Sequence, residues 1–199
     1  MRVLKKDLRG EEGEIALLPE SLDDLWHLQH LISRGDLVFA LTQRKLPAIA
    51  DKARPEKMER KTVRLGVKVE DVEFHMYSNW LRVHGIIKSG MDVGQHHTLN
   101  IEVGTDLSIL KYHWRPDLLA RIDEAVAESQ RPKVVIALIE EGEATIGILR
   151  QFGVQMAVEL RQGSGKGSGE DTRSGFLREV AAAIDQTAQD GADVILAGP

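Results

Sequence analysis

The chain has 199 residues, enough for one large domain or two small ones. With 42% hydrophobic residues, 29% charged residues and a net charge of −5, the composition excludes a disordered or collagen-like chain and one that is basic throughout. The absence of cysteine excludes disulfides, thiolate zinc sites and cysteine nucleophiles. The first residues, MRVLKKDLRG, lack the apolar core of a signal peptide, and no apolar run reaches the length of a membrane span, so we expect a cytoplasmic protein.

Short strands and one helix are predicted in the first half of the chain. Ser21 and Asp24 form a capping-box pattern at the start of an amphipathic helix over 21–34, and Gly35 follows as its expected C-terminal cap. Apolar and polar side chains alternate over 62–70, which predicts a strand with one buried face. One helix among several short strands favours a small, strongly bent β-barrel. The other predicted strands are 14–18, 37–41, 81–87, 99–103 and 107–112.

The hydrophobic period changes to that of a helix at 115–130, and we place a domain boundary there, with domains at 1–130 and 131–199. An α/β unit of this kind normally continues into a helix that covers the other face of its sheet, so we expect the chain to be a fragment of a longer protein. The alternative is a two-layer domain with one bare sheet face. The second domain is predicted to contain strands at 133–139, 144–150, 154–161 and 193–197 and a helix at 172–189.

A basic segment at 44–64 is the most informative stretch of charge. It contains eight basic and three acidic residues, a net +5; the remaining 18 basic and 28 acidic residues of the chain give −10. A cationic connection between two strands, extended by Pro47 and Pro55, can contact phosphates. The alternative is a solvated charged loop, because charge alone is weak evidence. The candidate RNA-binding residues are Arg44, Lys45, Lys52, Arg54, Lys57, Arg60, Lys61 and Arg64.

No catalytic centre is marked by the sequence. His27 and His30 are one helical turn apart and His96 and His97 are adjacent, but neither pair has an HExxH pattern or a third ligand at helical spacing. A structural role is therefore favoured for these histidines, and the position of any metal ion stays unknown. No cofactor is required by any pattern that we identify.

A glycine-rich loop at 163–169, GSGKGSG, resembles a phosphate-binding loop only superficially. Leu160 stands where a Walker A loop has its first glycine, and Gly167 stands where it has serine or threonine. We interpret Gly165, Lys166 and Gly167 as a contact loop with one cation; a flexible linker is the alternative.

Many separated segments together resemble the Pelota family, the ribosome-rescue paralogues of the class 1 release factors of archaea and eukaryotes. They are MRVLKKDL, PESLDDLWHLQHLISRGDLV, TQRK, VEDVEF, LRVHGII, GQHHTLNIE, VVIALIEEGEATIGIL and VILAGP, and their order spans the whole chain. The resemblance implies a mixed β and α/β protein: an N-terminal Sm-like bent β-barrel, then an incomplete ribonuclease-H-like α/β central domain. It also implies a C-terminal domain, before which this chain stops.

The resemblance further implies a function in ribosome rescue and mRNA surveillance. Members of the family enter the A site of a stalled ribosome with an elongation-factor-like GTPase and then work with an ABC-type recycling ATPase to split the subunits. The basic segment matches the barrel loop that reaches toward the mRNA path, and the loop at Gly165, Lys166 and Gly167 matches one that faces the GTPase or ribosomal RNA. We expect a monomer that does not bind membranes.

Peptide release is not expected, because the family's release factors use Gly-Gly-Gln and read stop codons with Asn-Ile-Lys-Ser. Val93-Gly94-Gln95 lacks the first glycine, and Ile86-Ile87-Lys88-Ser89 lacks the asparagine. Two alternatives remain open. One is a divalent-metal-dependent endoribonuclease acting on stalled mRNA, an activity attributed to the family; the other is a barrel that only binds protein.

Overall fold

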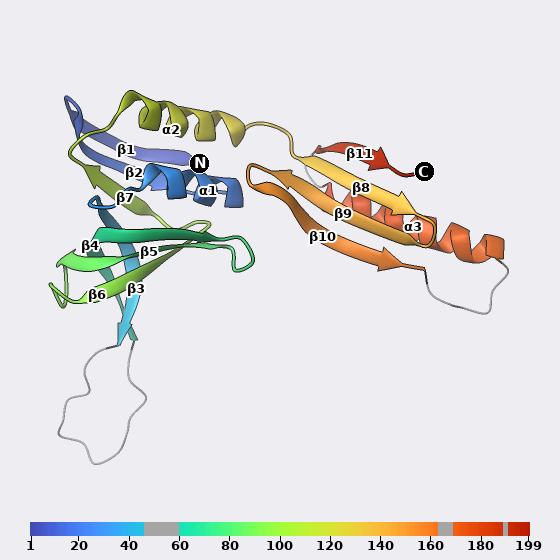
Figure 1. Ribbon diagram of the computed structural model, residues 1–199, viewed down its shortest axis with the longest axis horizontal. Helices are drawn as coiled ribbons and strands as arrows, with labels where there is room; N and C mark the ends of the chain where they lie inside the picture. The colour runs from blue at the N-terminus through green and yellow to red at the C-terminus, as the bar shows by residue number, and fades with distance from the viewer. Residues whose placement is uncertain (46–59, 163–168, 189–190) are drawn as a thin grey trace, which may run out of the picture. The chain divides into compact units, whose positions relative to one another are not determined.

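A computed structural model describes residues 1–45, 60–162, 169–188 and 191–199 (Figure 1). The chain divides into two units, Met1–Ser129 and Gln130–Pro199, each with its own hydrophobic core. Among the described residues, no helix combines the length and apolar character that a membrane crossing requires.

In its described residues, the first unit contains one antiparallel sheet of seven strands and two helices. The strands follow one another in the sheet in the order β1-β2-β7-β3-β4-β5-β6. The elements are β1 (Arg2–Arg9), β2 (Glu12–Leu18), α1 (Leu22–Leu31), β3 (Leu37–Lys45), β4 (Arg60–His75), β5 (Trp80–Ser89), β6 (His96–Glu102), β7 (Leu107–Lys111) and α2 (Pro116–Glu128).

Strand β4 bends the sheet. Its first part, 60–68, pairs with β3, and its second part, 66–75, pairs with β5, with register shifts after Gly66 and between Val69 and Asp71. Such bulges kink a strand and increase its twist. Gly85 permits the bend, because a Cβ there would overlap the carbonyl oxygen of Lys68. The bend brings β3 and β6 together, although two strands separate them in the sheet order. The sequence predicts a small, strongly bent β-barrel, and the structure confirms a strongly bent, mostly β unit.

The predicted alternation in β4 corresponds to the two faces of the sheet. Leu65, Val67 and Val69 are fully buried, whereas Lys68 is exposed. Apolar side chains of α1 and α2 complete the same core. Burial of this many aliphatic side chains supplies the main driving force for folding of the first unit.

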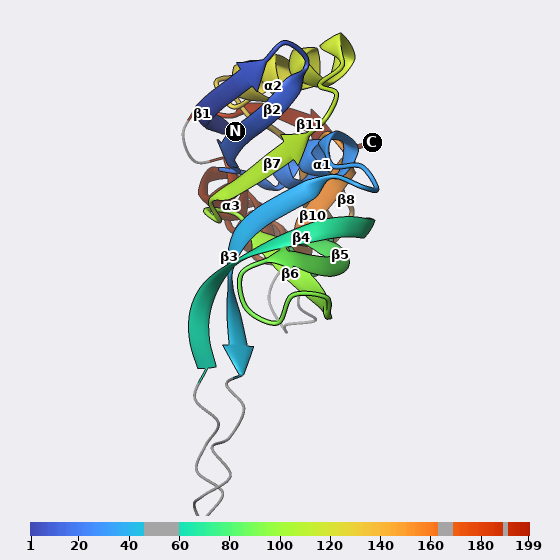
Figure 2. The same ribbon diagram turned by 90° about the vertical axis from the view of Figure 1, so that its left-hand side faces the viewer.

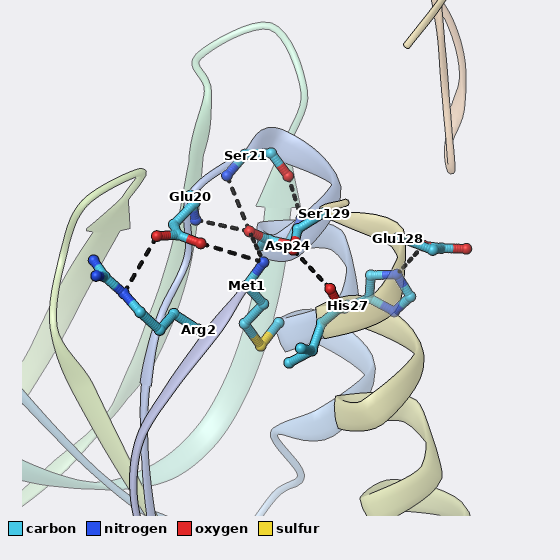
Figure 3. Close-up of polar contacts among 9 residues, drawn as sticks. Met1, Arg2, Glu20, Ser21, Asp24, His27, Glu128 and Ser129 are labelled. Carbon is cyan, nitrogen blue, oxygen red and sulfur yellow. Dashed lines mark hydrogen bonds and ion pairs between the residues drawn. The ribbon is translucent and has the colours of Figure 1, made fainter. Parts of the chain in front are cut away.

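The predicted capping box at the start of α1 is present. The Ser21 hydroxyl accepts a hydrogen bond from the Asp24 backbone N–H, and Oδ2 of Asp24 accepts from the backbone N–H groups of Ser21 and Glu20 at 3.0 and 2.7 Å. The same carboxylate also lies 2.7 Å from the α-ammonium group of Met1 (Figure 3). Met1 and Asp24 are only 1% and 2% exposed, so this ion pair is buried.

A second buried contact joins the two helices of this unit. His27 on α1 and Glu128 at the end of α2 lie 2.9 Å apart, from Nε2 to Oε2 (Figure 3). Pro116 is in the first turn of α2, as the sequence predicts. Proline is tolerated there because a backbone N–H in the first turn has no carbonyl partner within the helix, so its absence costs no hydrogen bond.

Two details of the first unit differ from the prediction. Helix α1 ends at Leu31 instead of residue 34, and Ile32 is its C-terminal cap in an extended conformation. Gly35 has a φ of 97° but belongs to the turn before β3, where its N–H donates to the carbonyl of Val69 at 2.8 Å. Strand β1 was not predicted, because its side chains are mostly charged and exposed; it is an edge strand that pairs with β2 alone.

The second unit is the predicted α/β arrangement, so the mixed β and α/β fold class is confirmed for the chain. Hairpins link three antiparallel strands, and β11 then pairs in parallel with β8, giving the order β10-β9-β8-β11. Phe176 and Val180 of the helix pack against Ala144 of the sheet. The elements are β8 (Val134–Glu140), β9 (Glu143–Arg150), β10 (Gly153–Arg161), α3 (Gly169–Thr187) and β11 (Asp193–Ala197).

Only one face of this second sheet is covered by α3 within the described residues. Side chains alternate between the two faces of a strand, so Val135 and Ala137, which are buried, point to the helix side, and Leu138 points to the other. That other face is apolar and exposed at Leu138, Leu149, Val154 and Met156.

The buried ion pair predicts the effect of Asp24→Asn. This change removes the nearer and buried carboxylate beside the Met1 ammonium and leaves it the half-exposed Glu20, whose Oε2 is 3.9 Å away, and we expect the free energy of unfolding of the first unit to fall by about 3 kcal/mol. All three tryptophans lie at or before residue 114, so tryptophan fluorescence during urea unfolding reports on this unit.

The matched control is Asp117→Asn in the first turn of α2, where the carboxylate pairs with Arg115 at the surface. Its effect should stay within about 0.5 kcal/mol. Equal losses for the two variants would contradict a stabilising role of the Met1–Asp24 pair.

Candidate nucleic-acid interface

The basic segment begins and ends on a two-stranded ladder. Arg44 lies opposite Lys61 and Lys45 lies opposite Arg60 in the register of β3 and β4. Figure 2 shows the ends of these two strands side by side. Lys45 and Arg60, between which residues 46–59 lie in the sequence, are therefore paired neighbours at this end of the ladder.

The Arg44 guanidinium is bound to the connection between β5 and β6. It forms an ion pair with Asp92, and its Nε donates to Oδ2 of that carboxylate at 3.2 Å. Nη2 also donates to Oε1 of Gln95 at 3.2 Å. Arg44 was predicted to contact RNA; in this structure, its side chain is occupied at the base of the segment.

His97 completes this cluster from strand β6. Its Nε2 lies 3.1 Å from Oγ1 of Thr42, and its Nδ1 lies 3.5 Å from Nη1 of Arg44. Burial lowers the pKa of His97, and the positive charge of Arg44 and the nearby His84 lower it further. A neutral imidazole can lie beside the guanidinium without charge repulsion, so the cluster joins β3 to β6 where the sheet bends.

The other described basic side chains have different surroundings. Lys61 is exposed to solvent. Nη2 of Arg64 donates to Oγ of Ser108 on β7 at 3.0 Å. Lys61 and Arg64 are both exposed on the ladder, although Arg64 has this one hydrogen bond within the protein, whereas Arg44 is half-buried and held by Asp92.

The remaining predicted site residues are only partly described. For Lys45 and Arg60 the backbone is described as strand. Lys52, Arg54 and Lys57 of the basic segment lie outside the described residues, as do Gly165, Lys166 and Gly167 of the contact loop. Their RNA and partner contacts stay predictions.

Sequence reasoning did not find the partners of Arg44. Asp92, Gln95 and His97 are about fifty residues further along the chain, and only the bend of β4 brings them to the end of β3. The alternation of β3 places Thr42 and Arg44 on one face, but a single sequence does not show what that face meets.

This cluster predicts that Arg44 stabilises the base of the basic segment. Arg44→Met removes an ion pair and further hydrogen bonds, and we expect the free energy of unfolding of the first unit to fall by about 1–2 kcal/mol. Urea unfolding followed by tryptophan fluorescence measures this. Lys61→Met, directly opposite in the ladder, is the control and should change stability by less than about 0.5 kcal/mol. A loss of stability confined to Lys61→Met, or equal in both variants, would contradict the stabilising role of Arg44.

Comparison with known proteins agrees with this architecture. A family model described as the Pelota N-terminal domain matches residues 1–126. A curated protein pelota homolog of Methanothrix thermoacetophila is 68% identical over 199 residues, which are 100% of this chain and 57% of the relative. The chain thus spans little more than half the length of that relative.

Solved structures give the same result. The crystal structure of Archaeoglobus fulgidus Pelota is 43% identical, with a TM-score of 0.51, over 100% of this chain and 52% of that protein. A model of ribosome-bound archaeal Pelota and ABCE1 contains a chain that is 37% identical, with a TM-score of 0.55, over 100% of this chain and 58% of that one. Because the family model covers more than half of its residues, the chain belongs to the Pelota family.

Proposed function

We propose that the chain is the N-terminal part of a ribosome-rescue and mRNA-surveillance factor that binds the A site of stalled ribosomes. The observation that carries this proposal is the similarity, at 37% identity over the whole chain, to an archaeal Pelota in a ribosome-bound model with ABCE1. The chain spans 58% of that protein, so the activity belongs to the longer molecule.

The charge distribution supports contact with RNA through the basic segment. The segment carries a net +5 and leaves the end of the β3–β4 ladder, while the rest of the chain is acidic. RNA phosphates attract such a segment, and the net negative charge of the rest of the chain disfavours phosphate contact with its other surfaces. Arg44, the first residue of the segment, is held by Asp92.

This role requires binding and recruitment and no bond cleavage by the chain itself. The factor occupies the vacant site together with an elongation-factor-like GTPase, and an ABC-type ATPase then promotes subunit dissociation in the cytoplasm. Gly165, Lys166 and Gly167 would contact the GTPase or ribosomal RNA. The protein would act as a monomer without a cofactor. Release of the peptide is not part of this function, because the sequence has no Gly-Gly-Gln.

Neutralising part of the basic segment tests the proposal. Lys45→Gln, Lys57→Gln and Lys61→Gln are combined in one variant, which leaves the Arg44 cluster intact. Each lost phosphate contact reduces the release of counterions, so the affinity for stalled ribosomes should fall and the slope of log K against log salt should become shallower by about two. Sedimentation of the 199-residue chain with ribosomes, over a range of salt concentrations, measures both.

A charge-matched control separates local contacts from net charge. Lys5→Gln, Lys6→Gln and Lys88→Gln also remove three positive charges, from exposed positions on β1 and β5. This variant should retain most of the affinity and the original salt slope. The proposal fails if the basic-segment variant binds with unchanged affinity and slope, or if the control loses as much.

A further inference from the structure

Three potential metal ligands meet on the outer face of β4, β5 and β6. Glu70, His84 and His96 each offer one ligand atom, and these atoms all lie within 4.8 Å of one another. They are far apart in the sequence, on three different strands, and none belongs to the basic segment. The two histidines do not have the spacing of a helical metal-binding motif, so the sequence alone did not predict this cluster.

The sheet register explains how the three side chains come together. The register shift between Val69 and Asp71 leaves Glu70 as the extra residue of a bulge in β4. Such bulges redirect a side chain. His84 lies opposite Thr98 and His96 lies opposite Ile86, so the two histidines are diagonal neighbours on the face that points away from the core.

The distances suit coordination of one ion. Nε2 of His96 and Oε2 of Glu70 are 3.3 Å apart. Two ligands of a tetrahedral zinc ion, each about 2.0–2.1 Å from the metal, are separated by about 3.3 Å. The rings of His84 and His96 are stacked, with centroids 5.6 Å apart and planes inclined by 10°. Small side-chain rotations would bring the ligand nitrogen of His84, now within 4.8 Å of the other two ligand atoms, to about the same 3.3 Å separation.

A hydrogen bond already orients one of the rings. Nδ1 of His84 lies 2.9 Å from Oγ1 of Thr98. Metal-bound histidines commonly use one ring nitrogen for such a bond, which directs the other nitrogen to the ion. With Nδ1 of His84 engaged by Thr98, Nε2 is the nitrogen suited to coordination.

The chemistry of the donors selects the kind of ion. Two imidazoles and one carboxylate suit Zn²⁺ and related transition metals, whereas Mg²⁺ and Ca²⁺ prefer sites made of oxygen ligands alone. The side chain of His96 is 61% exposed, which leaves room for a water molecule as fourth ligand. We propose that Glu70, His84 and His96 form a three-ligand site for Zn²⁺ that joins strands β4, β5 and β6.

Metal titration of the untagged 199-residue chain tests this site. Co²⁺ serves as a spectroscopic probe, because tetrahedral coordination gives visible absorption bands, and Zn²⁺ should displace it at one ion per chain. Zn²⁺ should also raise the melting temperature of the first unit, because it binds the folded strands only, and a chelator should reverse the rise. Mg²⁺ at the same concentration should do neither.

Single substitutions identify the ligands. Glu70→Gln, His84→Asn and His96→Gln should each weaken Zn²⁺ binding by at least about tenfold. The matched control is His113→Gln, which removes another exposed imidazole paired with a carboxylate: Nδ1 of His113 lies 2.7 Å from Oε2 of Glu11. This variant should bind Zn²⁺ as the unchanged protein does.

Because His84 is half-buried, its variant is first checked for folding by tryptophan fluorescence; Glu70→Gln and His96→Gln carry the conclusion if it unfolds. The proposal is overturned if the unchanged chain gives no Co²⁺ bands and no Zn²⁺-dependent stabilisation. It is also overturned if Mg²⁺ stabilises equally, or if His113→Gln weakens binding as much as His96→Gln. Zn²⁺ binding here is independent of ribosome binding, so either proposal can fail without the other.

Discussion

The bend of strand β4 is the constraint on which both candidate clusters of polar side chains in the first unit depend. One strand pairs with β3 along its first part and with β5 along its second. It can do so only where the backbones approach closely, as they do at Gly85, and where a bulge changes the twist. The fold thereby positions residues that a flat sheet would keep apart, including Arg44 beside Asp92 and Glu70 beside His96.

The described basic side chains of the segment differ in their contacts. At its base, the guanidinium of Arg44 is held by an acidic partner, and Arg64 is bound to Ser108. Lys61 and Arg64 are both exposed on the same ladder. Internal contacts of this kind reduce the number of cations that can reach phosphates.

Local signals in the sequence predicted much of the fold. The alternation of Val67 and Val69 with Lys68, the capping box of Ser21 and Asp24, and Pro116 each depend on neighbours a few residues away. These are the interactions that a single sequence records. Strand β1 was not predicted, because it is an exposed edge strand whose sequence has little apolar periodicity.

The candidate sites were harder to predict, because they depend on contacts between distant segments. The charge of the basic segment is visible in the sequence, but the pairing of Arg44 with Asp92 depends on the bend. In the same way, Glu70, His84 and His96 become neighbours only through the register of three strands and one bulge. A shift of one residue in that register would turn these side chains to the opposite face.

The first backbone nitrogen of the chain has a chemical role of its own. Its charge is matched by the Asp24 carboxylate, which also organises the first turn of α1. An amide at this nitrogen, such as an acetyl group or an added affinity tag would create, is neutral and needs space in a buried location. Blocking this nitrogen would therefore remove the charge that the Asp24 carboxylate matches.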